Sequence, residues 1–138
     1  MLPPAYAELH CLSSFSFLRG ASQPVELAER AEALGYAALA LTDECSVAGV
    51  VRAHAALKGR RTRLIVGTEL HLDCGLPLVV LAADRRGYGQ MCRLITRARR
   101  AAPKGSYVLQ RADVEALLEP EHCLLLWAPR PAQCRDSA

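Results

Sequence analysis

The hydrophobic pattern changes period several times along the chain, and each change predicts a new element. Residues 6–12 alternate between apolar and polar side chains, which predicts a short strand. Apolar residues then recur at helical spacing as far as Leu34, with Ser22 as the expected N-cap and Gly35 as the stop. The apolar run at 36–43 predicts a strand buried on both faces, as in a parallel sheet.

Strands and helices continue to alternate in the rest of the chain. Residues 46–60 return to helical spacing, and the expected inward stripe is Val47, Val50, Val51, His54 and Leu57. Strands are predicted at 63–72 and 76–84, joined like a hairpin, and a helix follows through 86–102. A short capped helix at 109–119 and a further buried strand at 122–129 complete the pattern. Because crossovers between parallel strands are right-handed, this order predicts an α/β fold with mainly parallel strands, as a sheet or part of a barrel.

Composition supports a single globular domain. The 138 residues are 51% hydrophobic and 22% charged, which is ordinary for a folded protein of this length. No apolar run approaches a membrane span and the first residues do not resemble a secretory signal, so we expect no membrane contact and a cytoplasmic location. The cysteines form no CxxC pair and lie mostly in aliphatic surroundings, which favours reduced, mostly buried thiols. They are Cys11, Cys45, Cys74, Cys92, Cys123 and Cys134.

The net charge of +3 conceals a strongly basic middle segment. Residues 52–111 hold thirteen Lys and Arg against three acids, and most of these cations are arginine, which suits bidentate contact with phosphate. Two interpretations remain open: a solvated basic face, or contact with the DNA backbone. The candidate nucleic-acid-binding residues are Arg85, Arg86, Arg93, Arg97, Arg99, Arg100 and Lys104.

Polar side chains follow three predicted strands where each strand ends. His10, the pair Asp43 and Glu44, and Glu69 occupy these positions. Because chemistry in parallel α/β folds collects at the carboxyl ends of strands, they are candidate ligands for Zn, Mn or Mg. Taken singly, His10 could instead be a structural core residue and Asp43 a helix N-cap.

Four segments together resemble a known family. "YAELHCLSSFSFLRGAS", "LGYAALALTDECSVAGVVRAH", "IVGTELHL" and "ADRRGYGQMCRLITRARRAAPKGSY" are similar, in order and spacing, to the N-terminal PHP (polymerase and histidinol phosphatase) domain of bacterial error-prone DNA polymerases. These are C-family relatives of the polymerase III alpha subunit. The resemblance implies a partial PHP-type distorted β/α barrel at residues 1–128, with 129–138 as a frayed tail.

The resemblance also implies where metal ligands would lie. In metal-binding members the first motif is His-x-His followed by an acid, and the corresponding positions here are His10, Leu12 and Arg19. The second motif, Thr-Asp-His, is "TDE", so Asp43 is kept and Glu44 replaces the histidine, while Glu69 matches the glutamate of the third strand. A leucine cannot ligate metal and an arginine adds positive charge, so we expect no bound metal and a Glu–Arg network in its place.

The family's polymerase aspartates lie in a downstream palm domain that is not in this sequence, so we expect no catalysis by the chain alone. It would be part of a truncated, split or excerpted gene, and would pack as a structural and interaction module on the remainder of an error-prone polymerase, in DNA replication or repair. Its open strand edges would be prone to association. One alternative is a metal-dependent phosphoesterase or 3′-5′ exonuclease with His10, Asp43, Glu44 and Glu69 as ligands; a weaker one is redox sensing by Cys11 and Cys45.

Overall fold

The computed structural model describes residues 5–129, which form one curled sheet of five strands with helices packed against it. The strands lie in chain order, so that each pairs with the next one in sequence. They are β1 (Ala7–Cys11), β2 (Ala38–Leu41), β3 (Arg63–His71), β4 (Pro77–Ala82) and β5 (Cys123–Trp127). The first three are parallel, whereas β3–β4 and β4–β5 are antiparallel. The expected α/β class and partial barrel are confirmed, with parallel pairing limited to β1–β3.

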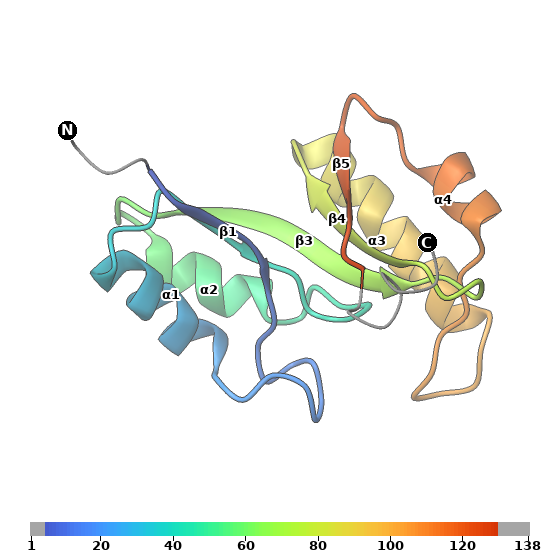
Figure 1. Cartoon of the computed structure of the whole chain (residues 1–138), viewed down its shortest axis with the longest axis horizontal. Helices are drawn as coiled ribbons and strands as arrows, with labels where there is room; N and C mark the ends of the chain where they lie inside the picture. Colours follow the sequence, from blue (N-terminus) through green and yellow to red (C-terminus); the bar gives the residue numbers. More distant parts are fainter. Residues whose placement is uncertain (1–4, 130–138) are drawn as a thin grey trace, which may run out of the picture.

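Two pairs of helices cover different parts of the sheet. They are α1 (Pro24–Ala33), α2 (Val50–Leu57), α3 (Arg85–Arg100) and α4 (Arg111–Leu117). Figure 1 shows β3 running the length of the molecule, with α1 and α2 beside its first half and α3 and α4 beside β4 and β5. Because α1 and α2 connect parallel strands, they fall on one face of the sheet and leave the strand ends accessible. None of the described helices is long and apolar enough to cross a membrane.

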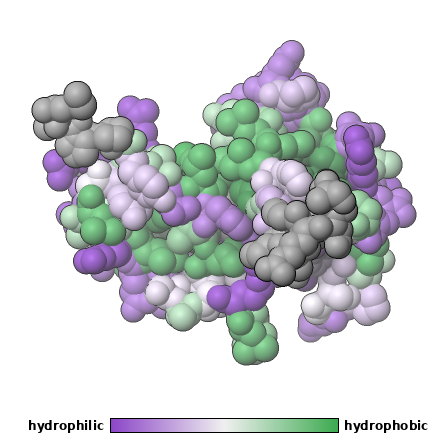
Figure 2. Space-filling model, in the orientation of Figure 1, coloured by the Kyte–Doolittle hydropathy of each residue, from purple (hydrophilic) through white to green (hydrophobic). Residues whose placement is uncertain are grey.

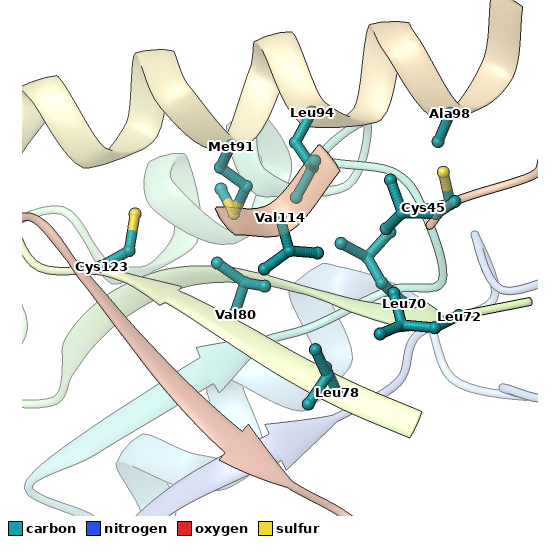
Figure 3. Packing of buried hydrophobic residues seen from close by; sticks show 11 residues of the cluster. Cys45, Leu70, Leu72, Leu78, Val80, Met91, Leu94, Ala98, Val114 and Cys123 are labelled. Atoms are coloured by element: carbon teal, nitrogen blue, oxygen red, sulfur yellow. The ribbon is translucent and has the colours of Figure 1, made fainter. Parts of the chain in front are cut away.

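The main core lies between α3, α4 and the sheet. Met91, Leu94 and Ala98 recur at helical spacing on α3 and pack on Leu70 and Val80 of β3 and β4 (Figure 3). All five side chains are fully buried. This packing fixes α3 against the second half of the sheet.

A close backbone contact lets α3 approach β5. A Cβ built on Gly87 would lie 1.9 Å from the carbonyl oxygen of His122, a distance that no side chain can occupy. The nearby Gly89 on the same helix has nothing within 4 Å of its Cβ position. The first glycine is therefore required by packing and the second is not.

Two predicted burial patterns were wrong in part. In α2 the buried positions are Ala53 and Leu57, so Val51 (75% exposed) and His54 point to solvent. Leu57 of the predicted stripe is buried and Val47 packs against the core, but α2 begins only at Val50 and turns Ala53 inward in place of Val51 and His54. In the last strand Leu124 and Trp127 are 58% and 61% exposed, because β5 is an edge strand that the described helices only partly cover.

The helix cap of α1 and the state of the cysteines can also be compared with the sequence predictions. The N-cap of α1 is Gln23, which forms a capping box with Glu26, and not Ser22 as predicted. The five cysteines among the described residues are free thiols, but only Cys45 and Cys123 are buried, so the expectation of mostly buried thiols was wrong. Cys134 and nearly all of the predicted frayed tail lie outside the described residues.

Candidate functional site

The carboxyl ends of β1, β2 and β3 bring six polar side chains together, which we call the strand-end cluster. Its members are His10, Arg19, Glu44, Glu69, His71 and Tyr107. Strand pairing extends past β2, because Glu44 forms a parallel bridge to Glu69 and the Cys45 amide donates to the Glu69 carbonyl at 2.8 Å. The two carboxylates are thereby placed next to each other.

A bulge in β1 brings His10 into the cluster. Ala7 pairs with Ala38, but the register shifts between Glu8 and Cys11. Strand alternation alone would place His10 on the face opposite to Ala7, and the bulge re-aims it toward Glu69. The side chain of His10 is 38% exposed, so the alternative of a core histidine is wrong.

Glu69 is the centre of the strand-end cluster. Its side chain is only 3% exposed, and its Oε1 accepts from both Arg19 Nη1 and His71 Nε2 at 2.5 Å. Its Oε2 lies 2.5 Å from Nε2 of His10, which donates to it. A buried carboxylate of this kind is stable only when each oxygen has a donor, and here three side chains supply them.

Arg19 joins Glu69 to Glu44. The same Nη1 atom donates to Glu44 Oε2 at 2.8 Å, and the Tyr107 hydroxyl donates to Glu44 Oε1 at 2.9 Å. Every oxygen of the two carboxylates is therefore bonded to a donor of the protein. Arg19 comes from the loop after β1, and Tyr107 from the segment between α3 and α4.

These contacts keep both acids ionised. Burial alone would raise the pKa of Glu69, but the donors Arg19, His71 and His10 outweigh it and lower the pKa from 4.5 to about 2. For Glu44, burial likewise raises the pKa, but the hydrogen bonds from Arg19 and Tyr107 lower it by more, so that the pKa decreases overall. The hydrogen bond to Glu69 raises the pKa of Arg19 against the opposing effect of burial. Neither glutamate can act as a general acid near neutral pH.

Asp43 lies outside this cluster and organises the loop after β1. It is 1% exposed and accepts three hydrogen bonds at 2.7 Å, from the Ser13 amide, the Ser13 hydroxyl and the Ser16 hydroxyl. The N-cap of α2 is Gly49, so the alternative of an N-cap role for Asp43 is wrong as well. Asp43 instead ties the loop that carries Arg19 to the end of β2.

The donor set fits a divalent metal poorly. Ligand atoms of Glu44, Glu69 and His71 lie within 4.8 Å of one another, as metal ligands would. However, Arg19 places a permanent cation on both carboxylates, and Leu12 offers no donor atom. A metal ion would have to displace the guanidinium from Glu44 and Glu69.

The sequence predicted part of this arrangement. His10, Glu44 and Glu69 come together as expected, and Arg19 contacts both glutamates. His71 was missed, although its position two residues after Glu69 places it on the same face of β3. Tyr107 was also missed, and it comes from a non-helical segment whose path the pattern does not specify.

Burial disfavours a redox role at the strand ends. It raises the pKa of both the Cys11 and Cys45 thiols to about 11, so both are protonated near neutral pH. Reactive cysteines need the thiolate form.

The predicted nucleic-acid-binding cations lie on α3 and just after it, and they are not equivalent. Arg86 pairs with Glu119 at 3.2 Å and Arg97 with Asp113 at 2.5 Å. Arg99 donates to the Cys45 carbonyl and stacks 5.3 Å from the centre of the Tyr107 ring. The other members, Arg85, Arg93, Arg100 and Lys104, make no ion pair with a described residue.

Comparison with known sequences gives concordant matches. The model of the PHP domain family matches residues 8–128. An error-prone DNA polymerase of Dechloromonas aromatica is 60% identical over 129 residues, which cover 91% of this chain and 13% of that protein. Those of Pseudomonas aeruginosa and Azoarcus sp. are 56% and 46% identical, covering 91% and 100% of the chain but only 12% and 16% of the relatives. The chain thus spans a small fraction of the length of these relatives.

Solved structures share the fold. A candidate metal-dependent phosphoesterase from Bifidobacterium adolescentis superposes with a TM-score of 0.58 at 25% identity, covering 72% of this chain and 35% of that one. An amidohydrolase from Chromobacterium violaceum, solved with bound sulfate and no metal, also gives 0.58, at 30% identity, with 70% and 34% covered. Both matched chains extend well beyond the part that corresponds to this sequence.

Proposed function

This chain belongs to the PHP domain family, and from that premise we propose that it works as a structural and interaction module of an error-prone DNA polymerase. Residues 1–128 would be the N-terminal portion of the PHP domain. The partner would be the remainder of the polymerase, and the setting would be cytoplasmic DNA replication or repair. In this proposal nucleotidyl transfer depends on parts of the polymerase that this sequence does not contain.

The guanidinium of Arg19, which bonds both Glu44 and Glu69, is the observation that supports a structural role. A cation at this position neutralises the carboxylates that a metal would otherwise hold. Unlike a metal, it has no vacant coordination position and cannot activate a water molecule. The strand ends are then held together by ion pairs and need no metal.

A metal-dependent phosphoesterase or 3′-5′ exonuclease is the second candidate. It is favoured by the close approach of Glu44, Glu69 and His71 and by the likeness to the Bifidobacterium adolescentis protein. Zinc, manganese or magnesium would be the metals in question. Arg19 and Leu12 count against this candidate, because one competes for the carboxylates and the other supplies no ligand.

Restoring the family's metal motif separates the two candidates. We expect protein purified without chelator to hold well under one metal ion per chain, and manganese or zinc to leave its melting temperature unchanged. The double variant Leu12→His, Arg19→Asp should gain metal-dependent stabilisation, by about 2.7 kcal/mol when the free metal is at a hundred times its dissociation constant. Leu12→His alone keeps the arginine and is the matched control. Stoichiometric metal and exonuclease activity in the unaltered chain would establish the second candidate instead.

Contact between the basic residues and DNA remains a prediction. Arg85, Arg93, Arg100 and Lys104, which make no ion pair with a described residue and are not held to a backbone carbonyl as Arg99 is, lie along α3 and its end. If they contact phosphates, retention of labelled DNA on a filter should fall steeply as salt rises. Retention that does not depend on salt would contradict this contact.

A further inference from the structure

A groove runs between α3, α4 and the segment that joins them, and neither the PHP fold nor the strand-end cluster accounts for it. We call it the α3–α4 groove; it has a volume of about 770 Å³. Figure 1 shows α4 beside α3 at the end of the molecule away from α1 and α2. The lining residues that carry the inference are Arg93, Arg97, Arg100, Val108, Asp113 and Leu117.

The groove has an excess of positive charge. Its acid, Asp113, is only 14% exposed and is already bonded to Arg97 at 2.5 Å and to the Gln110 amide at 3.1 Å. Arg93 and Arg100 make no ion pair with a described residue. They are seven residues apart on α3, so they lie on the same side of the helix about 10 Å apart along its axis. Two unneutralised cations therefore flank the internal ion pair.

The floor of the groove is apolar and fixed in place. Val108 is 45% exposed there, next to Leu117 and Ala101. The Val108 amide donates to the Ala98 carbonyl of α3 at 3.1 Å, which holds this segment against the helix. Apolar side chains and the two arginines thus line the same groove.

From this arrangement we infer that the α3–α4 groove binds an acidic segment of a partner protein, with one apolar side chain on the floor and carboxylates at Arg93 and Arg100. Charge complementarity selects an acidic partner. The exposed valine selects a segment with an apolar anchor, since burial of such a side chain supplies the affinity that exposed ion pairs lack. This inference is independent of the proposed function.

DNA suits the groove less well. Of the described arginines on this side of α3, Arg86 and Arg97 are already neutralised by carboxylates of the chain. None of the described lining residues is aromatic, so the groove offers no stacking platform for the bases of a single strand. A duplex backbone would gain nothing from the apolar floor.

A short fluorescent peptide with a central leucine flanked by aspartates tests the inference on the full chain by fluorescence anisotropy. We expect Arg93→Gln and Arg100→Gln each to weaken binding about fivefold, and Val108→Ser to weaken it by a similar factor. Arg85→Gln is the matched control, because this exposed arginine of α3 does not line the groove and should leave affinity unchanged. Circular dichroism of each variant verifies that it is folded.

Two further probes can overturn the inference. A peptide with serine in place of leucine should bind at least several-fold more weakly, and oligothymidylate of equal charge should not displace the leucine peptide. Equal binding of the serine peptide would mean simple charge attraction. Displacement by oligothymidylate would mean a nucleic-acid groove, and absence of any peptide binding would also refute an acidic partner.

Discussion

Replacing Arg19 by glutamine removes the cation from between two carboxylates and leaves a polar side chain in its place. The loss of folding stability can be estimated from the pKa of Glu69 and from the exposure of Arg19 and Glu44. Lowering the pKa of Glu69 from 4.5 to about 2 corresponds to roughly 3 kcal/mol of stability at neutral pH, shared among Arg19 and two histidines. The contact with Glu44 adds at most about 1 kcal/mol, because Glu44 and Arg19 are 28% and 35% exposed and solvent screens the pair. One share of the Glu69 contribution together with the Glu44 contact leads us to expect that Arg19→Gln lowers the free energy of unfolding by about 2 kcal/mol.

This deficit should depend on pH in a defined direction. The folded-state pKa of Glu69 lies below its unfolded value, so its contribution is complete above pH 4.5 and is lost as the pH falls toward 2. The titratable groups that face Glu69 are Arg19, His10, His71 and Glu44. The difference between the variant and the unaltered chain should therefore shrink as the pH falls from about 4.5 toward 2.

Urea denaturation followed by circular dichroism, with chelator present, measures both effects. Arg61→Gln is the control, since Arg61 is 90% exposed and lies 3.7 Å from Glu32, so its removal should change stability by less than about 0.5 kcal/mol. A variant at Arg19 that is as stable as this control at neutral pH would refute the structural role of the guanidinium. A deficit that is equally large near pH 3 would show that ionised Glu69 is not its cause.

Two more predictions concern packing. Gly87→Ala should lower the free energy of unfolding by several kcal/mol, because the new Cβ would lie 1.9 Å from the His122 carbonyl oxygen. Gly89→Ala should raise it by about 0.5–1 kcal/mol, because alanine has the higher helix propensity and nothing lies within 4 Å of its Cβ position. Urea denaturation compares the two variants, and equal changes in stability would contradict the close contact at Gly87. The Cys45 thiol is 1% exposed and burial raises its pKa to about 11, so it should react with a thiol reagent near pH 8 only after unfolding. The exposed Cys74 should react at once. Peptide mapping of the labelled sites measures the order, and labelling of Cys45 before Cys74 would contradict the prediction.

The sequence predicted the order of elements well and their exposure less well. Every described strand and helix was expected within a few residues, because caps and changes of hydrophobic period are local signals. Whether an apolar side chain is buried depends on what covers it. Leu124 and Trp127 are in a strand that is apolar throughout, yet β5 is an edge strand and both remain exposed. Figure 2 shows the result as a hydrophobic area between β1 and β5 on the open face of the sheet.

The sequence predicted which residues lie at the strand ends but not where their side chains point. Strand order was enough to bring Glu44 and Glu69 to one edge, because parallel strands share their carboxyl ends. It could not show that neighbouring Asp43 points away into a buried hydroxyl network. Nor could it show that a bulge in β1 turns His10 toward Glu69, since bulges leave little signal in a hydrophobic pattern.

A guanidinium and a divalent metal can stabilise the same pair of acids, yet they leave different chemistry available. Arg19 bonds to Glu44 and Glu69 through fixed N–H donors and keeps its charge at any physiological pH, so the acids stay ionised. It accepts no lone pair from water or phosphate, which a metal would do to generate hydroxide and polarise a phosphoryl group. The loop that carries Arg19 is held by Asp43 through bonds that do not involve the cluster. Removing the arginine should therefore free the carboxylates without dismantling the strand ends, which is why the double variant at Leu12 and Arg19 is expected to fold and to bind metal.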